Sequence, residues 1–326
     1  HRGGKIPKTC KTQADIIDNI DKYISLAKLY ASKIRQVKKN LPIAVVSAPN
    51  NRGLSRLEDW NNKLAKEDFY DAIIIHPYAK VVKGKDVAGR MLTVIPEGVG
   101  EKETYMIYKD RAIQYIISDF KLEIDKYNRT YKNKAIWLTE WNLQMSSVTG
   151  NTLLQALFVA HQLIELASLE NSNIEIATFH NLAGRTLSGS MIMSKDGKVY
   201  KNATFNSMKI IKELFQGPLY LESKSELKKD CFQYCFVSKE ENKKLYYWIN
   251  WREEPIKIGV GFSGKKHEYF GNMEATQNIT GKIINFNKDS NQVKIELTIN
   301  SVSNEVDFDY TVLEDTLSIN GTIDIL

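Results

Sequence analysis

Apolar residues recur at steps of three and four between Ala14 and Val37, which predicts one long helix with a single apolar face. The run Ile43–Ala48, just after Pro42, is short, β-branched and apolar throughout, as is typical of a strand buried on both faces. This alternation continues along the chain. It predicts three more strands and four more helices, at Tyr70–His76, Lys134–Glu140 and Ile174–His180 and near 54–66, 104–129, 150–170 and 204–216. Four strand-then-helix units predict a parallel α/β sheet.

The period of the pattern changes after Gln216-Gly217-Pro218. Short β-rich segments then follow one another, separated by turn residues and without a convincing helix, at Cys231–Val237, Leu245–Trp251, Ile256–Phe262, Val293–Ile299 and Val306–Val312. About a hundred residues of this kind are the usual size of an antiparallel β-sandwich. We therefore predict an α/β domain over residues 1–216 and an all-β domain over residues 217–326.

Composition narrows the class of protein. The chain has 326 residues, 43% of them hydrophobic and 26% charged, enough for one large core or two ordinary ones. Mean hydropathy is −0.35 and no apolar run approaches the roughly 18 residues of a membrane span, so we expect none. The net charge of +6 originates in residues 1–40, which hold ten Lys and Arg against three Asp. A solvated helix face explains this excess, and we expect no nucleic-acid partner because no basic motif with interleaved aromatic residues accompanies it.

Polar and aromatic residues replace aliphatic ones abruptly at the end of each predicted strand. In parallel α/β proteins the active site forms at the carboxyl ends of the strands, so these residues are the candidates for chemistry. The strand ends are Ser47-Ala-Pro-Asn50, His76-Pro-Tyr78, Thr139-Glu-Trp-Asn142 and Phe179-His-Asn181. Side chains of this kind on a rigid platform are what a substrate site needs.

Glu140 is the sharpest of these candidates. Counting by twos predicts that Glu140, Leu138 and Ile136 share the inner face of the sheet, while Trp137 faces the surrounding helices. A carboxylate above a layer of Leu and Ile is costly unless it is hydrogen-bonded or solvated by a cleft, which favours a functional role. The alternative is a rim glutamate paired with a neighbouring lysine.

The order of these strand ends resembles clan A of the glycoside hydrolases. The segment Trp137-Leu-Thr-Glu-Trp-Asn142 is similar to the nucleophile motif on the seventh strand of these retaining (β/α)8-barrel enzymes, which include α-L-arabinofuranosidases, β-xylosidases and agarases. His76-Pro-Tyr78 resembles the sixth-strand His/Tyr element, and Phe179-His-Asn181 resembles a sugar-contacting element of the eighth strand. A β-sandwich after the eighth helix is also common in these families.

The resemblance implies the C-terminal half of a barrel, strands 5–8, followed by an antiparallel β-sandwich. It implies a retaining O-glycoside hydrolase acting on a plant, algal or microbial polysaccharide or oligosaccharide, with no cofactor, no metal and an extracellular or periplasmic location. Glu140 would be the nucleophile. The substrate-binding residues would be His76, Tyr78, Trp141, Asn142, His180, Asn181 and, more weakly, Trp60.

One departure from the clan matters for activity. The acid/base carboxylate of the clan lies in an Asn-Glu pair that ends the fourth strand, and nothing before Ile43 supplies such a pair. A retaining glycosidase needs two carboxylates about 5 Å apart, so we expect this chain alone to be inactive. The expected partner is the missing N-terminal half of the barrel, in the same or a separate chain. The edge at Ile43–Ala48 would otherwise need to be paired or covered.

Each candidate residue has a plainer interpretation. His76 and Tyr78 either hydrogen-bond Glu140 or close the barrel top, and Trp141 offers its ring to a sugar or packs at the rim. His180 and Asn181 bind hydroxyl groups or order a loop. His161 lies inside the apolar helix Leu153–Leu166 and is interpreted as a satisfied core histidine.

Two rival functions follow from the same residues. His76, Glu140 and His180 on successive strand ends would suit a metal site with two histidines and one carboxylate, in a metal-dependent barrel hydrolase. The other is a non-catalytic carbohydrate-binding or scaffold protein that kept the sugar site and lost the acid.

Overall fold

The structure is a computed structural model. It describes residues 20–50, 53–82, 93, 95–144, 148–169, 172–184, 189–195, 197–238 and 243–252, and beyond these the backbone of five strands between residues 256 and 322. Residues 14–19, where the first predicted helix begins, lie outside the described residues.

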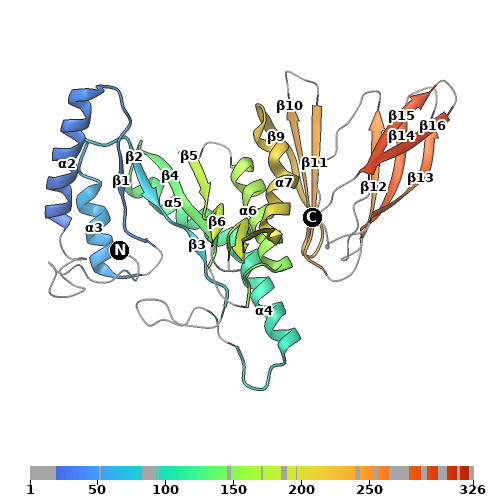
Figure 1. Cartoon of the computed structure of the whole chain (residues 1–326), viewed down its shortest axis with the longest axis horizontal. Coiled ribbons are helices and arrows are strands. Elements are labelled where there is room, and N and C mark those ends of the chain that lie inside the picture. The colour runs from blue at the N-terminus through green and yellow to red at the C-terminus, as the bar shows by residue number, and fades with distance from the viewer. Residues whose placement is uncertain are drawn as a thin grey trace.

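A parallel sheet forms the centre of the N-terminal part (Figure 1). The strands lie in the order β1-β2-β4, with β5 on the other edge of β4 and the short β3 pairing with the end of β4. Their bounds are Ala44–Val46 for β1, Ala72–Ile75 for β2, Tyr78–Ala79 for β3, Ala135–Leu143 for β4 and Ile174–Phe179 for β5. All of these pairs are parallel, which confirms the predicted α/β class. Closure of the strands into half a barrel stays a prediction.

Helices follow the strands as the periodicity predicted. They are α2 (Ile20–Val37), α3 (Ser55–Leu64), α4 (Glu101–Gln114), the π-helical turn η1 (Tyr115–Asp119), α5 (Phe120–Thr130), α6 (Leu153–Ser168), α7 (Ala203–Ile211) and the 3-10 turn η2 (Lys212–Phe215). Local capping explains two of the starts. Glu103 accepts a hydrogen bond from the Gly100 N–H at 2.9 Å, and the Thr152 hydroxyl accepts one from the Gln155 N–H at 3.3 Å.

The two faces of the sheet differ in burial. Ile136 and Leu138 are fully buried in a core that they share with residues of the helices. On the opposite face Val46 is 47% exposed and Ile176 is 37% exposed, and Trp137 is only half-buried. We call this side the open face. The predicted assignment of the faces was therefore wrong, because Ile136 and Leu138 pack under the helices and Trp137 lies on the open face.

The free edge of β1 is covered by side chains. The Tyr23 hydroxyl of α2 accepts a hydrogen bond from the Val46 N–H at 2.7 Å, and the Trp60 indole of α3 donates to the Val46 carbonyl at 3.3 Å. The two rings pack with centroids 5.1 Å apart. These bonds satisfy the outward N–H and C=O of Val46, whereas pairing of this edge with a further strand stays a prediction.

A small sheet between β5 and α7 was not predicted. It consists of β6 (Ala183–Gly184), β7 (Ile192–Lys195) and β8 (Lys198–Lys201). Asn202, directly after β8, donates its side-chain amide at 2.8 Å to the carbonyl of Ser190, two residues before β7. Strand β6 has only two residues, and all four side chains of β8 are exposed. Neither strand therefore has an apolar pattern that predicts it.

The residues after 217 form antiparallel sheets, as predicted. Three strands pair as β11-β10-β9, three as β12-β14-β13 and two as β15-β16. Their bounds are β9 Leu219–Lys228, β10 Cys231–Ser238, β11 Lys243–Asn250, β12 Ile256–Ser263, β13 Ile279–Asn287, β14 Gln292–Ile299, β15 Asp307–Leu313 and β16 Thr316–Thr322. The packing of these sheets into a sandwich stays a prediction.

The first of these sheets shares a core with the α/β part. Phe232, Tyr234 and Trp251 belong to the same buried cluster as the apolar face of α6. The ammonium group of Lys109, on α4, lies 2.9 Å from the carboxylate of Asp230 in the β9–β10 turn, and both are largely buried. Strands β9–β11 therefore share their core with the α/β part. The division into two domains at residue 217 stays a prediction. Within the described part of the chain, no helix combines the length and the apolar character needed to cross a membrane.

Candidate active site

Strand β4 has one residue more than its neighbours where the candidate site forms. On the β2–β3 side, Leu138 pairs with Ile75 and Asn142 pairs with Tyr78. Four residue steps along β4, from Leu138 to Asn142, thus match three steps from Ile75 to Tyr78 in the neighbouring β2–β3 segment. The surplus residue lies between Leu138 and Asn142, in the segment that contains Glu140.

The β5 side has the same mismatch. The register with β5 shifts twice. Between Ile136 and Trp137 the surplus residue lies on β5, and between Leu138 and Trp141, which pair with Ala177 and Phe179, three steps along β4 match two along β5. One surplus residue on one strand is a β-bulge, and it reverses which face the following residues take. The bulge explains why counting by twos failed across this segment.

The bulge directs the Glu140 carboxylate toward the open face. Thr139 and Glu140 are both half-buried, whereas Trp141 is again in the core. The Tyr78 hydroxyl donates to Glu140 Oε2 at 2.8 Å, and His76 Nδ1 lies 3.6 Å from the same oxygen. The Glu140 side chain keeps 35% of its exposure, and no described residue hydrogen-bonds to its other oxygen, Oε1. We call His76, Tyr78 and Glu140 the open trio.

Two threonines support the open trio. The Thr139 hydroxyl lies 2.9 Å from His76 Nε2 and so fixes the imidazole from the side away from Glu140. The Thr178 hydroxyl, on β5, lies 2.7 Å from the Thr139 carbonyl oxygen and 3.2 Å from that of Leu138. Sequence reasoning missed both threonines. The one signal available was their position at a strand end beside a polar candidate.

Trp141 and Asn142 are buried among other residues of the fold and do not face the open side of the sheet. Trp141 is 2% exposed and packs edge-to-face on Phe179 with centroids 5.5 Å apart, so the expected aromatic surface for a sugar is not met in this structure. Asn142 is buried too, and its amide donates to the carbonyls of His180 at 2.7 Å and Gly189 at 3.0 Å. Both side chains support the end of β4 instead of lining the open face.

The remaining predicted residues separate into two places. His180 lies at the end of β5, with its ring edge-on to Tyr78 at a centroid distance of 6.3 Å, so it borders the open trio. Asn181 follows through a cis peptide bond, and its carbonyl accepts a hydrogen bond from the Met191 N–H at 3.0 Å. Trp60 lies at the edge of β1, where it contacts Val46 and Tyr23 and, among the described residues, makes no hydrogen bond or ring contact with the open trio. The structure thus brings together His76, Tyr78, Glu140 and His180.

A second group of the same residue types is fully buried. Trp251 Nε1 donates to His161 Nδ1 at 3.1 Å, so His161 carries its proton on Nε2, which lies 2.7 Å from the Tyr234 hydroxyl. That hydroxyl donates to Glu165 Oε1, which also pairs with Lys224. We call His161, Tyr234 and Glu165 the buried trio. This confirms the interpretation of His161 as a satisfied core histidine.

Burial dominates the titration of the buried trio. Burial, and next the charge of Lys224, lower the pKa of His161 from 6.5 to about 3. Burial, and next the Glu165 carboxylate, raise the pKa of the Tyr234 hydroxyl above its ordinary value. At neutral pH the histidine and the tyrosine of this trio are therefore both uncharged.

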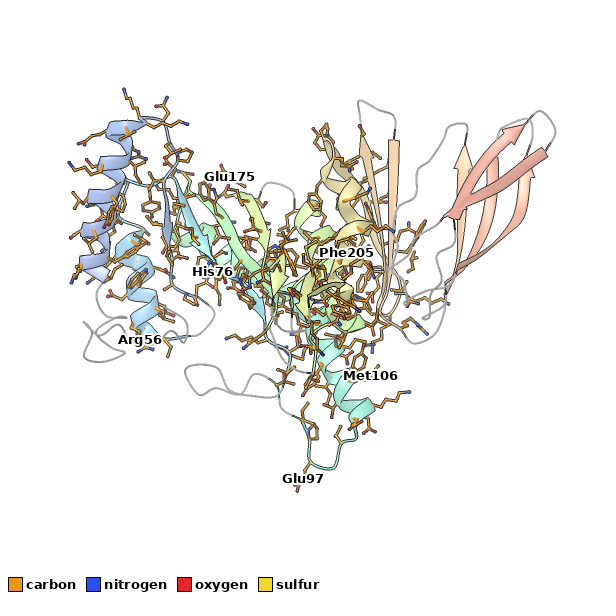
Figure 2. The ribbon with its side chains drawn as sticks, viewed as in Figure 1. Arg56, His76, Glu97, Met106, Glu175 and Phe205 are labelled. Carbon is orange, nitrogen blue, oxygen red and sulfur yellow. The ribbon has the colours of Figure 1, made fainter. Side chains whose placement is uncertain are left out.

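The metal alternative has no support in the geometry. Among the described residues, which include His76, Glu140 and His180, no three His, Cys, Asp or Glu side chains gather closely enough to hold a metal ion. Glu175 is a further carboxylate on the sheet, and it accepts a hydrogen bond from Trp137 Nε1 at 3.0 Å. Figure 2 shows Glu175 well apart from His76, toward the amino end of the strands.

Comparisons with known proteins give a likeness to solved structures but no family. No family model matches the sequence. A comparison with curated proteins gives no match either. Among solved structures, the chain is similar to the catalytic domain of GH30 xylanase C from Talaromyces cellulolyticus, with 8% sequence identity and a TM-score of 0.38 over 85% of this chain and 67% of that chain.

Proposed function

We propose that this chain carries the nucleophile half of a retaining O-glycoside hydrolase, with Glu140 as the nucleophile. The observation that supports this most strongly is the asymmetry of the Glu140 carboxylate. Its Oε2 accepts from Tyr78 and faces His76, while Oε1 has no hydrogen-bond partner among the described residues. A carboxylate held through one oxygen leaves the other oxygen in a fixed place to attack carbon.

The chemistry takes two steps. Glu140 Oε1 attacks the anomeric carbon, the bond to the leaving oxygen breaks, and an acid/base carboxylate gives that oxygen its proton. Water then attacks the same carbon, gives its proton to the acid/base, and releases Glu140. Two displacements at one carbon retain the anomeric configuration. Tyr78 and His76 support the first step by fixing Oε2 and stabilising the negative charge before attack.

The acid/base carboxylate is proposed to come from a partner half of the barrel, in the same or a separate chain. The open face favours this arrangement. Val46, Ile176 and Trp137 are apolar or aromatic groups left partly exposed on the side of the sheet where the site opens. A partner that covers this face would remove them from water, which is favourable by about 25 cal/mol for each Å². A carbohydrate substrate, whose hydroxyl groups both donate and accept hydrogen bonds, suits the hydroxyl, imidazole and carboxylate groups of the trio.

The test uses glycosides whose leaving group needs no proton. We expect the 326-residue chain to release about one equivalent of dinitrophenolate, and then stop, from at least one 2,4-dinitrophenyl glycoside of xylose, arabinofuranose or galactose. The burst stops because no base activates water for the second step. Glu140→Gly should lose the burst, and added azide should restore release with a glycosyl azide of inverted configuration. Glu175→Gln, a carboxylate change elsewhere on the sheet, should keep the burst.

Two results would contradict the proposal. One is a burst that survives in Glu140→Gly, since the nucleophile would then be another group. The other is saturable sugar binding by the wild type without any release from the whole panel. That second result would favour the carbohydrate-binding or scaffold protein over the enzyme.

A further inference from the structure

The direction of Glu140 depends on the bulge, and a bulge needs something to hold it. A surplus residue interrupts the regular ladder, so at least one backbone carbonyl there loses its usual partner on the next strand. Unless another donor replaces that partner, the segment can relax toward a regular strand. In a regular strand Glu140 would take the face of Leu138, under the helices, because alternate residues share a face.

Thr178 supplies a hydroxyl donor from the neighbouring strand. Its hydroxyl oxygen lies 2.7 Å from the Thr139 carbonyl and 3.2 Å from the Leu138 carbonyl, the two backbone groups that open the bulge. Thr178 is solvent-exposed on the edge strand β5, so packing does not require its side chain. The contribution of Thr178 to the structure is therefore mainly the hydrogen bonding of its hydroxyl to β4.

Resting on the proposed function, we propose that Thr178 is a positioning residue that holds the bulge of β4 and thereby aims Glu140 at the substrate, and that Thr139 is a second positioning residue that orients His76. The hydroxyl of Thr139 lies 2.9 Å from His76 Nε2, and the Glu140 carboxylate faces Nδ1. A proton on Nδ1 points to a negative oxygen, whereas a lone pair there would be repelled by it. Thr139 therefore donates to Nε2, and neutral His76 takes the Nδ1–H form.

Histidine ¹⁵N spectra test the two threonines without any sugar. The His76 signals are assigned by their loss in His76→Gln. Wild type should show a protonated Nδ1 and an unprotonated Nε2. Thr139→Val removes the hydrogen bond to Nε2, so the Nε2 signal should move toward that of an imidazole nitrogen without a hydrogen bond. Thr178→Val, which keeps the shape of the side chain, should move it in the same direction, whereas Thr178→Ser keeps the hydroxyl and should leave the wild-type spectrum.

A matched control is Thr130→Val. Thr130 also donates its hydroxyl to a backbone carbonyl, that of Lys126 at 3.0 Å, but at the C-terminal end of helix α5. It should leave the His76 signals unchanged. A wild-type spectrum in Thr178→Val would overturn the role of Thr178, and one in Thr139→Val would overturn that of Thr139. A change in Thr130→Val as large as that in Thr178→Val would also overturn the proposal, because the effect would then be general.

The dinitrophenolate burst adds a second readout. Thr178→Val should slow the burst by about tenfold to a hundredfold at saturating glycoside, since misplacing a reacting group by about 1 Å has costs of this size. Thr178→Ser should restore the wild-type rate to within about twofold. If the wild type gives no burst, the proposed function fails, and the ¹⁵N comparison still decides whether the threonines position the trio. An unchanged burst rate in Thr178→Val would contradict the inference alone.

Discussion

The molecule contains two groups of a histidine, a tyrosine and a glutamate, and they differ in what surrounds them. In the buried trio His161 is 0% exposed, both of its ring nitrogens have partners, and Glu165 pairs with Tyr234 and Lys224. In the open trio Glu140 is about one-third exposed and one of its two oxygens has no partner among the described residues. The residue types are the same, so the environment decides the role.

The difference follows from how each group is anchored. The buried trio joins α6 to β10 across the shared core, where an unsatisfied polar atom costs about 1–3 kcal/mol, and each polar side-chain atom of the trio has a partner. The open trio stands at the carboxyl ends of parallel strands, where a bulge and two threonine hydroxyls hold it. The first arrangement suits stability, and the second suits chemistry.

The largest expected effect is on turnover. In an assembled enzyme Glu140→Gln should lower turnover by about three orders of magnitude or more, because it keeps the shape of the side chain and removes the attacking charge. The same change should alter the free energy of unfolding by less than about 0.5 kcal/mol, as expected for a partly exposed side chain. Steady-state kinetics and urea denaturation measure the two. Near-wild-type turnover in Glu140→Gln would contradict the assignment of chemistry to the open trio.

The next effect is on stability and falls on the other trio. His161→Ala leaves a cavity and removes the acceptor of the Trp251 indole, so unfolding should become easier by about 3 kcal/mol. The matched change His76→Ala, at a partly exposed side chain, should cost no more than about 1 kcal/mol. Urea midpoints of the two variants give the contrast. Equal losses in the free energy of unfolding would mean that the two histidines contribute equally to stability, which would contradict the prediction.

Acid should weaken the buried trio specifically. The folded pKa of His161 is about 3 and its ordinary value is 6.5, so the unfolded chain binds the extra proton between these values. The stabilisation is complete above pH 6.5 and is lost as pH falls toward 3, at up to about 1.4 kcal/mol per pH unit. His161→Gln should flatten this part of the profile. Parallel stability profiles for wild type and variant between pH 6.5 and 4.5 would refute this origin.

A smaller effect is expected at Tyr78. Tyr78→Phe removes the hydrogen bond to Glu140 Oε2 while keeping the ring, so the burst of dinitrophenolate should slow by about tenfold. Tyr234→Phe makes the same chemical change in the buried trio and should leave the burst rate unchanged. A slower burst in Tyr234→Phe than in Tyr78→Phe would reverse the roles assigned to the trios.

The sequence pattern predicted the helices and the four parallel strands because apolar period is the strongest local signal. His161 was interpretable as a core residue because its helix is apolar on every side. The bulge was not predictable, since a surplus residue in a ladder changes hydrogen bonding without changing which residue types appear. That omission explains the reversed faces of Ile136, Leu138 and Trp137, and the burial of Trp141.

The interface between α6 and β10 was also beyond the sequence. Gln216-Gly217-Pro218 is a strong turn signal, and the period changes there, so a boundary was the natural prediction. Contacts such as Lys109 with Asp230 join residues more than a hundred positions apart, and neither residue carries a local sign of its partner. Pairing of this kind is a property of the folded core.

The most direct test of the central claim is to locate a covalent sugar on the chain. A 2,4-dinitrophenyl 2-deoxy-2-fluoroglycoside forms the glycosyl intermediate and slows its hydrolysis, so the adduct can be digested and mapped by mass spectrometry. We expect one label per chain, on Glu140, within the peptide that spans Ala135–Leu143. A label on any other carboxylate, such as Glu175, or no label from any sugar that the chain binds, would contradict it.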